Sequence, residues 1–247
     1  MMRFDSNGQL DTTFGTGGLT ALPFTVAAAI ALQSDGRILI ASAPDFNPGG
    51  GNGGTIVRFN PNGTLDKTFG FFGLVASAAS GGIFDTTGTA HVSNIVLQAD
   101  GKFIVAGTIT SRLINPPGSI ATGFGLIRYN PNGSIDTSFG THGGVLTNFA
   151  SNPTATAFAL ALQSNGDILA AGQAGSSLAL SRYTSAGKLD STFGPGGTVT
   201  TPLGSNASAI SSLALQSDGK IVAAGSIFSV DPAGFHAQSV VARYLAQ

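Results

Sequence analysis

Short apolar runs separated by glycine-containing turns fill the chain. In one representative stretch, residues 145–149, 157–162, 168–172 and 178–183 each have the length of a β-strand, and Asn165-Gly166 separates the second run from the third. Asn-Gly and Asp-Gly are strong hairpin signals, because both central residues of that turn need a positive φ. None of the runs has the 3.6-residue period of a helix. The pattern therefore predicts four strands in this stretch and an all-β protein.

The same arrangement recurs along the whole chain. A thirteen-residue string, Arg-aromatic-x₃-Gly-x-Leu/Ile-Asp-x-Thr/Ser-Phe-Gly, begins at Arg3, Arg58, Arg128 and Arg182, and a shortened copy begins at Arg243. A second string, Leu-Gln-x-Asp/Asn-Gly, lies between the second and third strands of every unit and begins at Leu32, Leu97, Leu162 and Leu215. Recurrence of this kind indicates a repeat architecture, with units at about 3–57, 58–127, 128–181 and 182–243.

Each unit is expected to form a four-stranded antiparallel meander. Its alanine-rich strands cannot bury both faces of a lone sheet, whereas radial stacking of several sheets can. We therefore predict a β-propeller of four four-stranded blades, with sixteen main strands after a short N-terminal stub. All of it forms a single domain, residues 1–247.

The strand count leaves two arrangements open. Four complete sets of strands permit a closed ring, which we favour, in which residues 1–4 are displaced and the unit 3–57 touches residues 182–242. The alternative is an open arc or a fragment of a larger propeller, with apolar sheet faces exposed at both ends and a tendency to self-associate. The chain also opens inside a repeat, as a fragment with an upstream targeting segment would.

The connections between strands fall into a constant set and a variable set. The Arg-to-Arg spacings are 55, 70, 54 and 61 residues, and the differences lie in two kinds of connection that share one end of a meander. The long connections are residues 43–54, 77–90, 108–123 and 227–238. Variable loops on a constant scaffold are a usual place for recognition. The candidate binding residues there are Asp45, Asn47, Arg112, Asn115, Asp231 and His236.

Composition and residue chemistry exclude several functions. Charged residues are 9% of the chain and the net charge is −1, so there is no field to hold nucleic acid or an anionic membrane. The absence of cysteine excludes disulfides and thiolate sites, and no apolar run reaches the ~18 residues of a membrane helix. The histidines, His91, His142 and His236, have no metal-ligand spacing. We assign no catalytic, cofactor-binding or metal-binding residue and expect no cofactor, no nucleic-acid partner and no membrane insertion.

The repeated strings resemble the delta-60 repeat family of bacterial β-propeller-like repeats. The resemblance is carried by Arg128-Tyr129, Gly133, Ile135-Asp136, Phe139-Gly140 and residues 162–166, with their equivalents along essentially the whole chain. It implies a propeller fold, a bacterial source and a secreted or surface-attached protein, and it transfers no catalytic residue. The chain departs from the family where Asp167 replaces the expected Lys or Arg, and where the second unit carries an insertion on each side.

The Arg and the Asp of the motif are eight residues apart in every unit, which permits two interpretations. They could form a ring of charged sites, one per blade, or a partly buried ion pair that fixes a turn. We favour the second, because a turn must be copied into every blade and a catalytic site rarely is. The motif Phe is expected to pack between neighbouring blades. The residues assigned to this structural repeat are Arg58, Asp66, Phe69, Arg128, Asp136, Phe139, Arg182, Asp190 and Phe193.

Three functions from different classes remain. The first is a non-enzymatic propeller module that serves as a scaffold or binds a macromolecule or glycan through the variable-loop face, at the exterior of a bacterial cell. The second is a hydrolase or lyase with a site in the central channel, for which the sequence offers few convergent acids or bases. The third is a sugar-binding lectin. Trp is absent and Tyr occurs only three times, and this scarcity of rings on which sugars stack counts against a lectin. Phe46, Phe84 and Phe235, which lie in expected loops, keep this function open.

Overall fold

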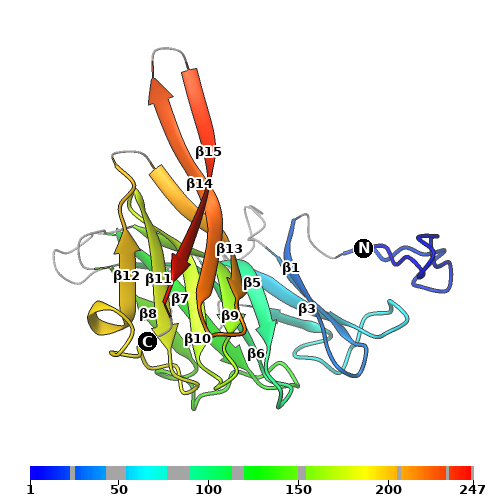
Figure 1. Ribbon diagram of the computed structural model, residues 1–247. Coiled ribbons are helices and arrows are strands. Elements are labelled where there is room, and N and C mark those ends of the chain that lie inside the picture. Colours follow the sequence, from blue (N-terminus) through cyan, green and yellow to red (C-terminus); the bar gives the residue numbers. More distant parts are fainter. Residues whose placement is uncertain are drawn as a thin grey trace.

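The computed structural model describes residues 1–22, 26–42, 54–76, 90–112, 120–149, 154–204, 207–231 and 234–245, and these residues form strands and turns (Figure 1). A single 3₁₀ turn, η1 (Pro195–Gly197), interrupts them. Among the described residues, no helix is long and apolar enough to cross a membrane. The strands are β1 (Ala27–Leu32), β2 (Ile38–Ser42), β3 (Thr55–Phe59), β4 (Leu74–Ala76), β5 (Ala90–Leu97), β6 (Phe103–Arg112), β7 (Ile120–Tyr129), β8 (Gly144–Thr147), β9 (Ala155–Leu162), β10 (Ile168–Ala174), β11 (Ser177–Tyr183), β12 (Thr198–Thr201), β13 (Ala207–Leu215), β14 (Ile221–Asp231) and β15 (Gly234–Tyr244).

The strands form four antiparallel sheets, which are the blades of the propeller. Blade 1 is β1–β4, blade 2 is β5–β8, blade 3 is β9–β12 and blade 4 is β13–β15. In every blade the strands lie side by side in chain order. The predicted all-β propeller is confirmed, but within the described residues the fourth blade has three strands, so fifteen strands are seen rather than sixteen.

The grouping of strands into units was wrong at one point. The sequence analysis placed the strand after each Arg motif at the start of the next unit. In the structure this strand pairs with the strand before the motif: β4 pairs with β3, β8 with β7, and β12 with β11. The reason is that the motif loop reverses the chain tightly, so that its two flanking strands become hairpin neighbours. The connection that follows, for example from β8 to β9, is the crossover to the next blade.

Two of the connections assigned to long loops are extensions of the strands. β6 and β7 stay paired as far as Arg112 and Ile120, and β14 and β15 as far as Asp231 and Gly234. The expected loops 108–123 and 227–238 are therefore mostly regular hairpin. Threonine and isoleucine dominate the ends of β6 and β7 and favour strands, and the continued ladder satisfies backbone groups that a loop would leave to water.

The first two strands of each blade share a β-bulge, and in blade 3 it lies beside Gly172. The register between β9 and β10 shifts between Ala171 and Gly172. A Cβ atom added at Gly172 would lie 1.9 Å from the carbonyl oxygen of Thr156, so the backbones approach too closely for any side chain. Gly172 thus permits the close approach at this bulge, and Gly107 and Gly225 hold the same place in blades 2 and 4, whereas blade 1 has Ser42 there.

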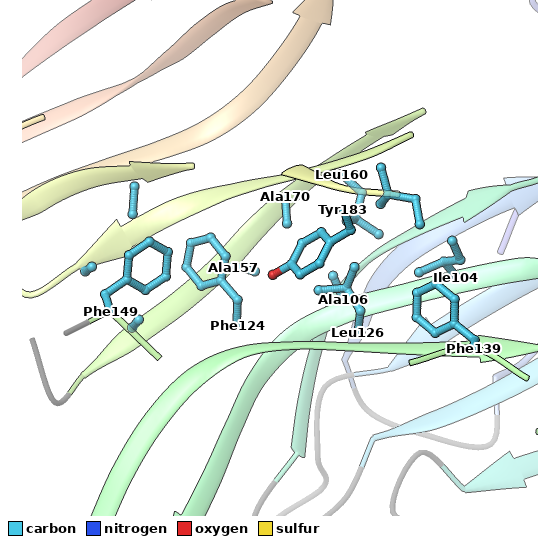
Figure 2. Close-up of a cluster of buried hydrophobic side chains, with 14 residues drawn as sticks. Ile104, Ala106, Phe124, Leu126, Phe139, Phe149, Ala157, Leu160, Ala170 and Tyr183 are labelled. Carbon is cyan, nitrogen blue, oxygen red and sulfur yellow. The ribbon is translucent and has the colours of Figure 1, made fainter. Parts of the chain in front are cut away.

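The hydrophobic core lies between the blades. One cluster joins blades 1 and 2, a second joins blades 2 and 3, and a third joins blades 3 and 4. Figure 2 shows the second cluster, in which Phe124 and Leu126 of blade 2 face Leu160 and Tyr183 of blade 3. Tyr183 is fully buried, and its hydroxyl hydrogen-bonds Thr147 at 2.7 Å and Ser181 at 2.9 Å.

The blades form an open arc, so the predicted closed ring was wrong. The described residues contain no buried cluster that joins blade 4 to blade 1; instead, the face of blade 1 that looks away from blade 2 packs partly on the N-terminal segment through Phe14. Ile30 on blade 1 and Val241 on blade 4 are exposed. The number of strands could not show whether the ring closes. The sequence specifies each contact between neighbouring blades, but not the total curvature that these contacts produce.

Candidate binding surface and the motif that supports it

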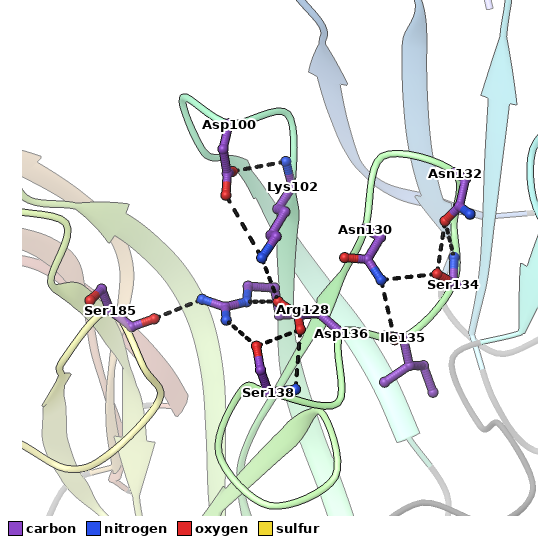
Figure 3. A network of polar contacts seen from close by, with 10 residues as sticks. All are labelled: Asp100, Lys102, Arg128, Asn130, Asn132, Ser134, Ile135, Asp136, Ser138 and Ser185. Carbon is purple, nitrogen blue, oxygen red and sulfur yellow. Dashed lines mark hydrogen bonds and ion pairs between the residues drawn. The ribbon is translucent and has the colours of Figure 1, made fainter.

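The Arg–Asp pair of the motif is an ion pair with a fixed geometry. The Nε of Arg128 donates to Oδ2 of Asp136 at 2.8 Å, and both side chains are about nine-tenths buried (Figure 3). The other carboxylate oxygen, Oδ1, accepts from the amide of Ser138 at 3.1 Å and from its hydroxyl at 2.6 Å. The Asp therefore caps the turn that follows it while it holds the Arg. The pairs Arg58–Asp66 and Arg182–Asp190 repeat this contact at 2.8 and 2.7 Å.

A second cation reaches the same carboxylate in blades 1 and 2. Lys102, which follows the Asp100-Gly101 turn, places Nζ 2.9 Å from Oδ2 of Asp136. Arg37 occupies the equivalent place and lies 3.2 Å from Asp66. In blade 3 the equivalent residue is Asp167, the position at which the chain departs from the delta-60 pattern. Asp190 thus pairs with Arg182 without a second cation of this kind.

These contacts keep the carboxylates ionised. Burial alone would raise the pKa of Asp136, but hydrogen bonds from Ser138 and Lys102 and the charge of Arg128 outweigh it and hold that pKa far below its ordinary value. For Asp66, burial is again the largest single effect, and Thr68 and Arg58 reverse it, so its pKa is lowered as well. An ionised carboxylate has no proton to donate near neutral pH, and a lowered pKa makes it a weak base.

The same Arg joins its blade to the next one. Nη1 of Arg128 donates to the carbonyl oxygen of Ser185 at 2.7 Å, in the motif loop of the following unit. Arg58 makes the equivalent bond to Pro131, and Arg3 to Pro61. The amide of Gly140 adds a parallel bond to the carbonyl of Ala186 at 2.8 Å. One guanidinium group therefore links the motif loop of its own blade to the motif loop of the next unit.

The motif Phe and Gly complete this joint. The guanidinium carbon of Arg128 lies 4.6 Å from the centre of the Phe139 ring, and Phe139 is buried in the cluster between blades 2 and 3. In the next unit, Gly187 has a φ of +81°, and a Cβ atom there would lie 2.8 Å from the Phe139 ring. Only glycine allows both the turn and the close approach of the ring. The Arg, Phe and Gly of the motif therefore form contacts between blades. The candidate surface for binding is the opposite end of the blades.

At that opposite end, the structure describes only some of the predicted binding residues. Arg112 and Asp231 are the last residues of β6 and β14 and pair with Ile120 and Gly234, and His236 lies in β15 opposite Ser229. These three residues belong to strands rather than loops, and β6 and β14 lie in different blades. The remaining three, Asp45, Asn47 and Asn115, lie outside the described residues.

An exposed aromatic pair on β14 and β15 escaped the sequence analysis. Phe228 and Phe235 stack with their ring centroids 5.7 Å apart and their planes tilted by 26°, and Phe235 is 66% exposed. Phe235 lies opposite Val230 and Phe228 opposite Ala237, so both rings are on one face of the hairpin. Strand alternation along residues 227–238 was the signal that could have placed the two rings together.

The described residues contain no group of three or more His, Cys, Asp or Glu side chains that could hold a metal ion. Between the turns of blades 1 and 2, a shallow depression is lined by Asp35 and Asp100 together with Gln33 and Gln98. Asp35 pairs with Arg37 and Asp100 with Lys102, so these carboxylates are already engaged.

Sequence comparison assigns the chain to a family. Residues 33–69, 98–139, 163–193 and 216–246, more than half of the chain, match the family described as a domain of unknown function (DUF5122) β-propeller. The chain belongs to this β-propeller family. Each matched segment begins at the Gln of the Leu-Gln string, and the first three end at or next to the motif Phe. No curated protein matches the chain in sequence.

Solved structures with a similar fold share little sequence with this DUF5122 propeller. The endo-arabinase from Bacteroides thetaiotaomicron has a TM-score of 0.52 and 10% identity over 89% of this chain and 76% of its own. The virginiamycin B lyase from Staphylococcus aureus, crystallised as an inactive variant with quinupristin, has a TM-score of 0.40 and 16% identity over 87% of this chain. The present chain spans 55% of the length of that lyase. At such identities the likeness to the endo-arabinase concerns the fold alone.

Proposed function

We propose that this chain is a non-enzymatic β-propeller module that binds a macromolecular partner through the β14–β15 hairpin. The observation that carries the proposal is the stacked pair Phe228–Phe235 on a hairpin that extends beyond its neighbour β13 (Figure 1). β13 begins at Ala207, opposite Phe228, so the segment of the hairpin that includes Phe235 stands free of its own sheet. Exposed aromatic rings on a rigid support are typical anchors of protein interfaces.

The chemistry of the pair favours a protein partner with an apolar recess. The rings present a flat apolar surface, and the chain as a whole has a net charge of −1 that offers no steering toward a polyanion. A glycan is the second kind of partner that stacks on aromatic rings, and it is an outcome of the test below. The end of the blades that carries the motif repeats the same short turns and Arg–Asp ion pairs. This constancy suits a role in holding the blades together rather than in recognition.

The delta-60 assignment, the bacterial source and a place at the cell exterior are parts of the same proposal, and they rest on the sequence resemblance. Fractionation of the source organism tests the location. Recovery of the chain from the cytosol alone would contradict it, and recovery from the surface or the medium would support it.

The test of binding compares two exposed aromatic pairs. Phe228→Ser/Phe235→Ser removes the proposed anchor, and Phe71→Ser/Phe72→Ser removes a pair of rings 4.7 Å apart on a motif loop. Wild-type protein is used to select ligands from a phage-displayed peptide library and from a glycan array. We expect peptide ligands whose binding falls at least tenfold in the first variant and is kept in the second. Binding only to glycans, equal loss in both variants, or release of reducing sugar from polysaccharides by the wild type would each contradict the proposal.

A further inference from the structure

The last blade carries an uncovered sheet face. On β15, Val241 is 71% exposed. It stands two residues before the motif Arg, and the residues at this place in the other blades, Ile56, Leu126 and Leu180, are fully buried against the following blade. Strand pairing puts Ala224 beside Val241 on the same face. Blade 4 therefore presents the apolar surface that every other blade buries against its successor.

The first blade carries the opposite face uncovered. On β1, Ile30 is 62% and Leu32 is 68% exposed. At the place of Ile30, blade 2 has Ile95 and blade 3 has Leu160, and both are buried against the preceding blade. Blade 1 thus presents the surface that every later blade buries against its predecessor.

These two faces are the halves of one interface that the chain builds three times within itself. In each internal copy, the face of the Ile56 type packs on the face of the Ile95 type, and a buried cluster results. The free face of blade 4 is consequently complementary to the free face of blade 1, and neither is complementary to itself.

The N-terminal segment covers only the outer part of the free face of blade 1. Phe14 packs in a cluster with Ile40 and Val57, but the inner strand β1 stays open. Met2 and Phe4 are themselves largely exposed, whereas Val57 and Phe59, at the same places of the repeat, are buried. Residues 1–4 correspond to residues 241–244, the end of β15. The segment therefore has the form of the outer half of a blade.

Among the described residues, blade 4 has the inner strands β13, β14 and β15 and no strand beyond β15. β15 lies at the edge of its sheet, whereas the equivalent strands β3, β7 and β11 each pair with a further strand. The residues that correspond to that further strand are 19–22, and the amide of Thr20 bonds the carbonyl of Met1 as the outer strands bond their neighbours. Residues 241–244 of one copy can take the place of residues 1–4 beside this segment of another.

We propose that copies of this chain associate head to tail, with the Val241 face of blade 4 in one copy docked on the Ile30 face of blade 1 in the next. Residues 19–22 of the second copy then lie along the free edge of β15, and Arg243 pairs with Asp11. A head-to-tail contact closes into a ring when its rotation permits and otherwise extends into a chain. Val241 lies toward the C-terminal end of β15, whereas Phe228 and Phe235 lie toward the turn between β14 and β15, so the two proposed contacts use different parts of the hairpin.

The experiment places one charge on either face. Ile30→Asp disrupts the free face of blade 1, and Val241→Asp disrupts the free face of blade 4. Both positions are exposed, so the fold of each variant is expected to persist. Sedimentation velocity of the 247-residue wild-type chain should give dimers or longer species, and each variant alone should be a monomer. A mixture of the two variants should give a one-to-one dimer and nothing larger, because each supplies one intact face. Phe71→Asp serves as the control for an exposed aromatic position and should behave as the wild type.

Three results would overturn the proposal. They are a monomeric wild type at all accessible concentrations, wild-type association retained in either single variant, and a mixture that stays monomeric. Association lost in Ile30→Asp and retained in Val241→Asp would mean that blade 1 pairs with itself. Circular dichroism of each variant confirms the fold before the comparison is made.

Discussion

Arg128 and Ser185 stand 57 residues apart in the chain and are joined by a 2.7 Å hydrogen bond from the guanidinium group to the carbonyl oxygen. The same guanidinium group is held by Asp136 within its own blade. Blades 1 and 2 are thus each connected to the next blade by an Arg that the turn of its own blade keeps in place. This explains why Arg and Asp recur at a fixed spacing while the connections at the other end vary in length.

Removal of one partner from this joint should destabilise the fold. Asp136→Ala leaves Arg128 and the Ser138 amide without their acceptor in a buried place, and we expect a loss of about 1–3 kcal/mol in the free energy of unfolding. Urea unfolding followed by circular dichroism measures it. The control is Asp11→Ala, in which the Arg3–Asp11 pair is more exposed, with 39% and 23% of the side chains accessible. An Asp136→Ala variant no less stable than Asp11→Ala would contradict the structural role of the motif.

The ion pairs also predict how stability changes with pH. The pKa values of Asp66 and Asp136 are lower in the folded chain than the ordinary 3.8. The unfolded chain therefore binds more protons between the two values, so stability is fully present above about pH 4 and is lost as the pH falls through the lowered pKa values. Urea unfolding should give similar midpoints at about pH 6 and 5 and a lower midpoint at about pH 3. In Asp136→Asn this slope should be smaller, and an unchanged slope would show that this carboxylate is not one of its sources.

The third blade offers a stabilising substitution. Asp167 stands where Arg37 and Lys102 supply a second cation to the motif Asp of blades 1 and 2. Asp167→Lys replaces a like charge near Asp190 with an opposite one, and we expect a gain of about 0.5–1 kcal/mol in the free energy of unfolding. The reverse change, Lys102→Asp, should cost a similar amount. A gain that persists in high salt would argue against an electrostatic origin.

The glycine of the motif should tolerate no side chain. Gly133 has a φ of +90°, and an added Cβ atom would lie 2.9 Å from the Phe69 ring of the preceding blade. Gly8 has a φ of +78° with open space around it. Gly8→Ala should therefore cost only the backbone strain, about 1–2 kcal/mol, and Gly133→Ala should cost more. Equal thermal midpoints for the two variants would contradict the role of Gly133 in the blade contact.

The sequence predicted the strands and the repeat well, because both depend on local signals. Asn-Gly and Asp-Gly turns, strand-length apolar runs and the recurrent Arg are all readable within a few residues of each other. Which strand pairs with β3 was not readable in this way, since the β4 strand could close the blade before it or open the one after it. The backbone pairing of β4 with β3 decides this, and the ion pair expected from the sequence is compatible with either grouping.

Longer-range features were harder to predict. The hairpin ends of β6 and β14 were taken for loops because their length varies between units, although Thr110 and Val230 lie in strands. The stacking of Phe228 on Phe235 depends on the register of that hairpin. Closure of the ring depends on the rotation between each blade and the next. No single residue of the sequence determines this rotation.

The open arc is tested most directly by distances between the turns at the constant end of the blades. Ser34, Ala99, Ser164 and Ser217 hold the same exposed place in blades 1 to 4, and the chain has no cysteine of its own, so pairs of cysteines introduced there can carry spin labels. The Ile30→Asp variant keeps the chain monomeric for the measurement by double electron–electron resonance. We expect short and similar distances for the neighbouring pairs 34–99, 99–164 and 164–217, and a clearly longer distance for 217–34. A 217–34 distance equal to the other three would mean a closed ring of four blades and would contradict both the open arc and the two free faces.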